Sequence, residues 1–69
     1  MQLRAQLAEA LRVWMEHNDF SQADAAKNLG ISQPRVSEIM RGKLELLSLD
    51  YLVGLCAKAG MPVKMRLAA

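Results

Sequence analysis

The sequence predicts a single all-α domain of four or five helices that ends in one short β-strand. Apolar residues recur at intervals of three and four along most of the chain, which is the period of an amphipathic helix. Serines that can cap helices precede three of these segments, and glycines follow them. Apolar residues make up 52% of the chain and charged residues 23%, as in folded globular domains. The length of 69 residues suits one such domain, so we expect a single domain over residues 1–69.

The first helix is predicted over residues 2–17. Its large apolar residues are separated by steps of four, four and three, which places them on one helical face: Leu3, Leu7, Leu11 and Trp14. Charged residues occupy other positions, and we expect them, Arg4 and Arg12 included, to point toward solvent. Trp14 is interpreted as a core residue beneath the second helix.

A second, short helix is predicted from Ser21 to Leu29. Ser21 and Asp24 have the spacing of a capping box, in which each side chain accepts a hydrogen bond from the other residue's backbone. Gly30 follows the helix and can adopt the left-handed conformation that ends one. The segment therefore has room for about two helical turns.

A third helix is predicted over residues 33–41, with Ser32 as its N-cap. Pro34 falls in the first turn, where a missing N–H costs nothing because that N–H would have no partner within the helix. Gly42 is expected to end the helix.

A fourth helix is predicted from the N-cap Ser48 to the glycine at position 60. Asp50 lies in its first turn, where a negative charge interacts favourably with the helix dipole. The apolar stripe of this helix consists of Leu49, Leu52, Val53, Cys56 and Ala59. We expect this stripe to face the core.

A short strand is predicted over residues 62–67, because Pro62 cannot continue a helix and the following residues alternate between apolar and basic. The apolar face of this strand consists of Val63, Met65 and Leu67. A single strand leaves its backbone N–H and C=O groups without partners. We therefore expect it to pair with the strand of a second copy about a two-fold axis, giving a homodimer.

The second and third predicted helices, joined by a short turn that contains glycine, have the proportions of a helix-turn-helix, here over residues 21–41. A helical wheel of the third helix places Val36, Ile39 and Met40 on one side, facing the core. The opposite side is mostly polar and consists of Pro34, Ser37, Glu38 and Arg41, with Gln33 and Arg35 on the flanks. Glutamine can read adenine and arginine can read guanine in the DNA major groove. This face is therefore predicted to contact DNA.

The positive charge of the chain is concentrated in this region. The whole sequence has a net charge of +2, which permits a polyanionic partner without requiring one. Residues 21–43 contain four basic and two acidic side chains, a net charge of +2. Residues 1–20 contain two arginines and three acidic side chains, a net charge of −1. The basic residues thus lie where DNA is expected to bind.

The stretch SQADAAKNLGISQPRVSEIMRGK, residues 21–43, resembles the helix-turn-helix of the Xre/Cro/lambda-repressor-like family. The resemblance extends from about Leu11 to Leu67 and is greatest to small antitoxins of the HigA type and phage-style repressors. It implies a lambda-repressor-like fold and a sequence-specific transcriptional repressor that binds a near-palindromic operator in double-stranded DNA. An antitoxin-type autorepressor, with a small toxin protein as a possible partner, is the role favoured by this resemblance.

The resemblance also implies a role for each DNA-binding candidate. Gln22, at the start of the second helix, is expected to contact a phosphate or the edge of a groove. The residues expected to face base edges are Gln33, Arg35, Ser37 and Glu38. Arg41 and Lys43 are expected to hold the DNA backbone. Many family members have a polar residue where this chain has Pro34, which can offer only van der Waals contact, for instance to a thymine methyl group. The relative weight of the glutamine and the arginine in base readout stays open.

Three alternatives were weighed against the operator-binding repressor. A protein-interaction module that neutralises a toxin without binding DNA is suggested by surplus apolar residues, namely Leu44, Leu46, Leu47, Tyr51 and Leu55. A stand-alone phage-type repressor would need no toxin partner. An RNA-binding domain is disfavoured, since the chain lacks a GxxG loop and aromatic residues on a sheet for base stacking.

The sequence offers little for catalysis or metal binding. It contains one cysteine and one histidine, Cys56 and His17, which are far apart in the chain and form no metal-ligand pattern. We therefore expect no enzyme activity, no metal and no cofactor. Charged residues interrupt the first fourteen positions, and no apolar stretch reaches the length of a membrane span, so we expect a cytoplasmic protein.

Overall fold

The computed structural model describes residues 3–61, which form four α-helices and contain no β-strand. The helices are α1 Leu3–His17, α2 Gln22–Leu29, α3 Gln33–Met40 and α4 Leu49–Lys58. The predicted all-α fold is confirmed for these residues. The predicted strand over residues 62–67, and with it the dimer contact, lies outside the described residues. None of the four helices is long and apolar enough to cross a membrane.

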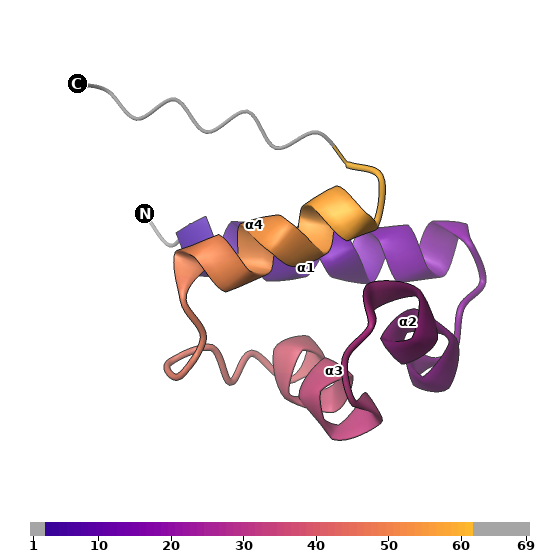
Figure 1. The fold of residues 1–69 in the computed structure, drawn as a ribbon, viewed down its shortest axis with the longest axis horizontal. Helices are drawn as coiled ribbons and strands as arrows, with labels where there is room; N and C mark the ends of the chain where they lie inside the picture. Colours follow the sequence, from indigo (N-terminus) through magenta and orange to yellow (C-terminus); the bar gives the residue numbers. More distant parts are fainter. Residues whose placement is uncertain (1–2, 62–69) are drawn as a thin grey trace.

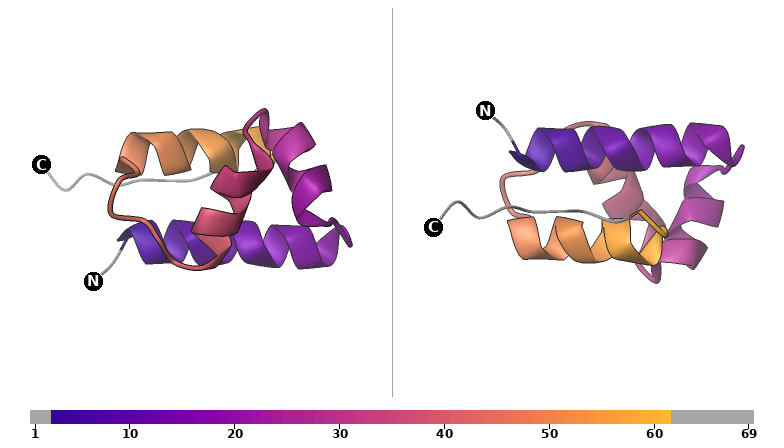
Figure 2. Two further views of the ribbon diagram at one scale, coloured as in Figure 1. Left: turned by 90° about the horizontal axis from the view of Figure 1, so that it is seen from below. Right: turned by 90° about the horizontal axis from the view of Figure 1, so that it is seen from above.

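The four helices form two layers (Figure 1). α1 and α4 lie side by side and run in the same direction, as the two views in Figure 2 show. α2 and α3 lie together on one side of this pair, where α3 packs against α2 and α1. The short helices therefore rest on a platform made by the two longer ones.

The core consists of two adjoining clusters of buried side chains. Leu11 of α1 and Leu52 of α4 are almost fully buried in the larger cluster, which connects all four helices. The smaller cluster lies under the two short helices and consists of Met15, Ala25, Ala26 and Val36. Trp14 packs against both clusters, with its ring edge-on to Phe20 at a centroid distance of 5.3 Å. Trp14 was predicted to be a core residue; it is half-buried and packs on the edge of the core.

The buried face of α1 differs from the predicted one. Its buried residues are Leu7, Ala8, Leu11 and Met15. Leu3, which was predicted to face the core, is 44% exposed. At about 100° per residue, the observed face is rotated by about 60° from the predicted one. Arg4 also lies on the rotated face; it is exposed, as expected, and its Nε donates a hydrogen bond to the carbonyl oxygen of Leu47 at 2.8 Å. The large apolar residues alone could not reveal this, because the small Ala8 is part of the face.

The apolar residues predicted to form a partner-binding surface belong mostly to the core. Leu47 and Leu55 are 4% and 3% exposed, and Leu44 and Tyr51 are half-buried against the larger cluster. Leu46 is the exception at 92% exposed. The loop before α4 folds onto the core because the Leu47 carbonyl is held by α1. The expectation of a continuous apolar patch here was therefore wrong.

The predicted helix caps are present. Ser21 Oγ accepts a hydrogen bond from the Asp24 N–H at 3.1 Å, and the Asp24 carboxylate accepts one from the Ser21 N–H at 3.0 Å, which completes the capping box of α2. The bond from the Ser21 backbone lowers the pKa of the Asp24 carboxyl. Ser32 and Ser48 cap α3 and α4 in the same way. α3 and α4 each end one residue earlier than predicted, with Arg41 and Ala59 as C-caps.

Ser21→Ala is expected to lower the free energy of unfolding by about 1 kcal/mol, because it leaves an N-terminal N–H of α2 without its partner. Ser37→Ala, within α3, is the matched control and should change stability by less than about 0.5 kcal/mol. Urea denaturation followed by circular dichroism measures both. Because the folded-state pKa of Asp24 is lowered, the capping-box contribution is present above the carboxyl's ordinary pKa and is lost as the pH falls through the lowered value. Equal stability of the two variants at neutral pH would contradict the prediction.

Candidate nucleic-acid interface

The turn between α2 and α3 is fixed at both ends. Gly30 adopts a left-handed conformation with φ of 70°, and its N–H donates to the carbonyl oxygen of Ala26. The Ile31 N–H donates to the same oxygen at 3.1 Å. Lys58 of α4 reaches across the fold, and its Nζ lies 3.4 Å from the carbonyl oxygen of Leu29, the last residue of α2. A cation at the C-terminal end of a helix is favourable, so α4 supports the turn directly.

The inner face of α3 is the predicted one. Val36 and Ile39 are buried and Met40 is half-buried against the core. With these three residues holding the helix to the core, the opposite face points outward. The outward orientation of the predicted DNA-contacting face follows from this packing.

Four predicted site residues line one shallow depression of about 340 Å³ on the surface, namely Gln22, Gln33, Pro34 and Ser37. Gln22 is the first residue of α2 and Gln33 the first residue of α3, so the depression lies where the two helices begin. Gln33 and Pro34 are exposed, and the other two side chains are half-buried. Two amides, a hydroxyl and an apolar ring are thus brought together, which provides hydrogen-bond donors and acceptors beside a small apolar surface.

Arg35 and Glu38 lie apart from this depression. The Nε of Arg35 is 3.7 Å from a carboxylate oxygen of Glu38, one turn further along α3. The guanidinium carbon of Arg35 lies 5.7 Å from the ring centroid of Tyr51, in the first turn of α4. Tyr51 was not among the predicted site residues, since no local pattern in the sequence connects it with α3.

Arg41 and Lys43 lie just beyond the end of α3, and both are exposed. The chain turns here through Gly42, with φ of 77°, and the Lys43 N–H donates to the carbonyl oxygen of Glu38 at 2.9 Å. Exposed basic side chains with a fixed backbone are suited to phosphate contacts. Their role in holding the DNA backbone stays a prediction.

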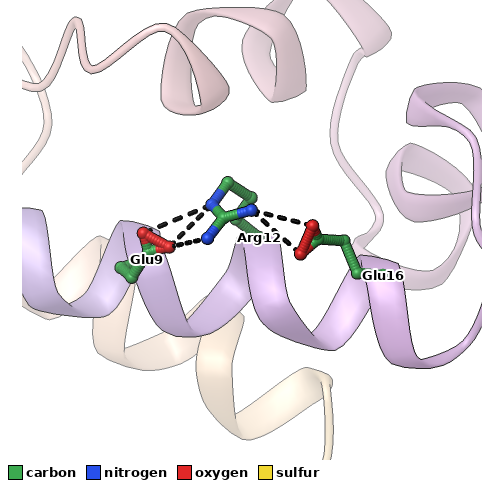
Figure 3. Close-up of polar contacts among 3 residues, drawn as sticks. All are labelled: Glu9, Arg12 and Glu16. Atoms are coloured by element: carbon green, nitrogen blue, oxygen red, sulfur yellow. Dashed lines mark hydrogen bonds and ion pairs between the residues drawn. The ribbon is translucent and has the colours of Figure 1, made fainter.

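The charges on α1 are largely paired with one another. Figure 3 shows Arg12 between Glu9 and Glu16, to which it forms hydrogen bonds one turn away in each direction. The bond from Arg12 lowers the pKa of the Glu9 carboxyl. Arg12 and the two carboxylates together have a net charge of −1, so this part of α1 does not attract a phosphate.

The two residues considered for other chemistry lie outside this interface. Cys56 is buried in the core, where desolvation raises the pKa of its thiol, and buried thiols of this kind are poor nucleophiles. His17 is exposed at the end of α1. Among residues 3–61, no three His, Cys, Asp or Glu side chains come together in a way that could hold a metal ion.

Comparison with known protein families identifies the motif. The model of a family described as a helix-turn-helix domain matches residues 1–68. This chain belongs to that helix-turn-helix family. The family match covers all four helices, and it agrees with the geometry of α2, the glycine turn and α3. No curated protein and no solved structure matches the chain. The helix-turn-helix assignment supports a DNA-binding regulator.

Proposed function

We propose that this helix-turn-helix protein is a sequence-specific repressor of transcription that binds an operator in double-stranded DNA. The observation that carries this proposal is the depression where α2 and α3 begin, lined by Gln22, Gln33, Pro34 and Ser37. It lies on the outward face of α3, and exposed basic residues follow at the other end of that helix. When bound at the operator, the protein would exclude other proteins from that stretch of DNA.

In the proposed complex, α3 enters the major groove with its N-terminal half toward the base edges. The side-chain NH2 group of Gln33 can donate to N7 of one adenine, and its carbonyl oxygen can accept from the N6 amino group of the same base. This bidentate contact distinguishes adenine from the other bases. Pro34 offers an apolar surface to a neighbouring thymine methyl group. Gln22, the first residue of α2, would contact a phosphate through its side-chain amide. The depression would thus read A·T base pairs.

We further propose that the protein binds as a two-fold dimer, through the strand predicted over residues 62–67. In that arrangement two copies of α3 would lie about 34 Å apart, in successive major grooves of a near-palindromic operator. This part of the proposal rests on the sequence pattern alone. The spacing of half-sites in the preferred DNA tests it directly.

The role of antitoxin-type autorepressor rests on the resemblance of residues 21–43. Four of the five residues that suggested a toxin-binding surface are core or half-buried, so the described residues offer no specific support for a toxin partner. The toxin-neutralising alternative without DNA binding is therefore not favoured.

Selection from a random pool of duplexes tests the proposed function. We expect the protein to enrich two copies of a half-site, and to bind the enriched duplex at least about 10³-fold more tightly than a scrambled one.

Lys43→Ala should weaken binding to both duplexes similarly and reduce the slope of log affinity against log salt by about one unit, since it removes a phosphate contact. Arg35→Ala should instead weaken mainly the specific complex. If the selection enriches no sequence, the proposed sequence-specific binding is contradicted. If it enriches single half-sites, binding as a two-fold dimer is contradicted.

A further inference from the structure

The side chain of Arg35 is held from two sides, and this suggests how its base contact is determined. We propose that Tyr51 is a positioning residue which, together with Glu38, aims Arg35 at a guanine next to the A·T pairs read by the depression. This inference rests on the proposed function, because it names a second element of the same DNA-binding site. It assigns a specificity role to a residue of α4, outside the helix-turn-helix.

Tyr51 is well placed to act as a fixed support. Its backbone N–H is bonded to the N-cap Ser48 at 3.0 Å, and its half-buried ring packs against the larger core cluster. Arg35 lies on a different helix, with its guanidinium carbon 5.7 Å from the ring centroid. A cation within about 6 Å of an aromatic centroid is attracted to the ring. The ring, which belongs to α4, therefore restrains the long side chain of Arg35. No residue of α3 provides this contact.

Glu38 determines which nitrogens of the Arg35 guanidinium remain available for DNA. Its carboxylate faces the Nε of Arg35 at 3.7 Å, an ion pair with both side chains about two-fifths exposed. Among the described residues, the two terminal nitrogens of Arg35 form no hydrogen bond. These two nitrogens are the donors that match O6 and N7 of guanine in a bidentate contact. The pairing thus leaves the base-reading edge of the guanidinium open.

The same carboxylate makes guanine a better target than phosphate. A phosphate contact relies mainly on net positive charge, which Glu38 partly offsets, and it would bring two anions close together. A guanine edge is neutral overall and offers two acceptors in fixed positions. Arg41 and Lys43, which have no ion pair with the described residues, are the better phosphate ligands. Arg35 is therefore assigned to base readout.

Replacement of guanine by 7-deazaguanine in the selected duplex tests the contact, because it removes the N7 acceptor and preserves base pairing. We expect one guanine of each half-site at which this replacement weakens wild-type binding about ten-fold. Arg35→Ala should abolish the sensitivity at that position. A wild-type protein that selects a sequence but is insensitive at every guanine would overturn this proposal and leave the proposed function standing. A protein that selects no sequence would contradict both.

A double-mutant cycle tests the role of Tyr51. Tyr51→Leu should weaken binding to the selected duplex about five-fold through loss of the aromatic support, and reduce the sensitivity to 7-deazaguanine. Tyr51→Phe, which keeps the ring, should stay within about two-fold of wild type. In the Arg35→Ala background, Tyr51→Leu should cause no further loss. Equal losses in both backgrounds would show a purely structural role and overturn the proposal. The affinity of each variant for the scrambled duplex corrects for any change in its folded fraction. If Tyr51→Leu unfolds the protein, Tyr51→Phe still provides a variant for the test.

Discussion

Leu52→Ala is expected to lower the free energy of unfolding by about 2–5 kcal/mol. Leu52 is fully buried, at 0% exposure, in the cluster that joins all four helices. Its truncation removes apolar contacts and leaves a cavity. Because the four helices pack against one another, they can move only partly into that cavity. A single core in a domain of this size supplies on the order of 3–5 kcal/mol of net stability. Much of the variant should therefore be unfolded at 25 °C, and specific DNA binding should fall with the folded fraction.

Leu46→Ala is the matched control, because the same substitution is made at a leucine that is 92% exposed. Its stability should remain within about 0.5 kcal/mol of the wild type. Urea denaturation, followed by circular dichroism at several protein concentrations, measures both variants and separates unfolding from any change in association. Similar losses for the two variants would mean that Leu46 is covered in the folded protein in solution, and would contradict the assignment of the core.

The helix ends could be predicted well because their signals are local. A serine three residues before a free N–H, and a glycine where φ must be positive, act within one turn of the chain. Ser21, Ser32, Ser48 and Gly30 all have the predicted roles. The outward face of α3 could also be predicted, because three apolar residues at helical spacing leave one orientation for the rest.

The contacts between elements could not be predicted, because no periodic pattern encodes them. Arg4 was expected only to point toward solvent, and no pattern in the sequence indicates a role for Lys58; each side chain donates a hydrogen bond to the main chain of another segment. Leu46 and Leu47 are neighbours in a loop, where no helical or strand period indicates which one is buried. The buried face of α1 differs from the predicted one for a related reason. The positions of α4 and of the loop before it decide which of two adjacent faces of α1 is buried.

The candidate site was predicted as a set of residues and divided by the structure into three groups. The first group lines the depression, the second consists of Arg35 with Glu38 and Tyr51, and the third consists of the exposed Arg41 and Lys43 after α3. The sequence could place these residues on α2, α3 and the loop that follows. It could not show that Tyr51 approaches Arg35, because that proximity depends on how the loop returns α4 to the core.

Gln33→Ala is expected to weaken binding to the selected duplex by about 1–3 kcal/mol, with little change in binding to scrambled DNA. Gln33 is exposed at the start of α3 and lines the depression beside Pro34 and Ser37. Its amide can both donate to and accept from one adenine, and it lies on α3, the helix proposed to enter the major groove. Removing it should therefore make the adenine position of the half-site tolerant of other bases, and not only reduce affinity.

Gln6→Ala provides a control of the same chemistry, since Gln6 is exposed on α1, away from the depression. It should leave affinity and base preference unchanged. Fluorescence anisotropy against a set of duplexes with each base at each half-site position measures both quantities at one salt concentration. Because Gln33 is exposed and its backbone lies in the first turn of a capped helix, the substitution should leave the fold intact, so unfolding would not account for a loss. If Gln33→Ala weakens every duplex equally, its amide contacts the DNA backbone and base readout must rest on other residues of α3.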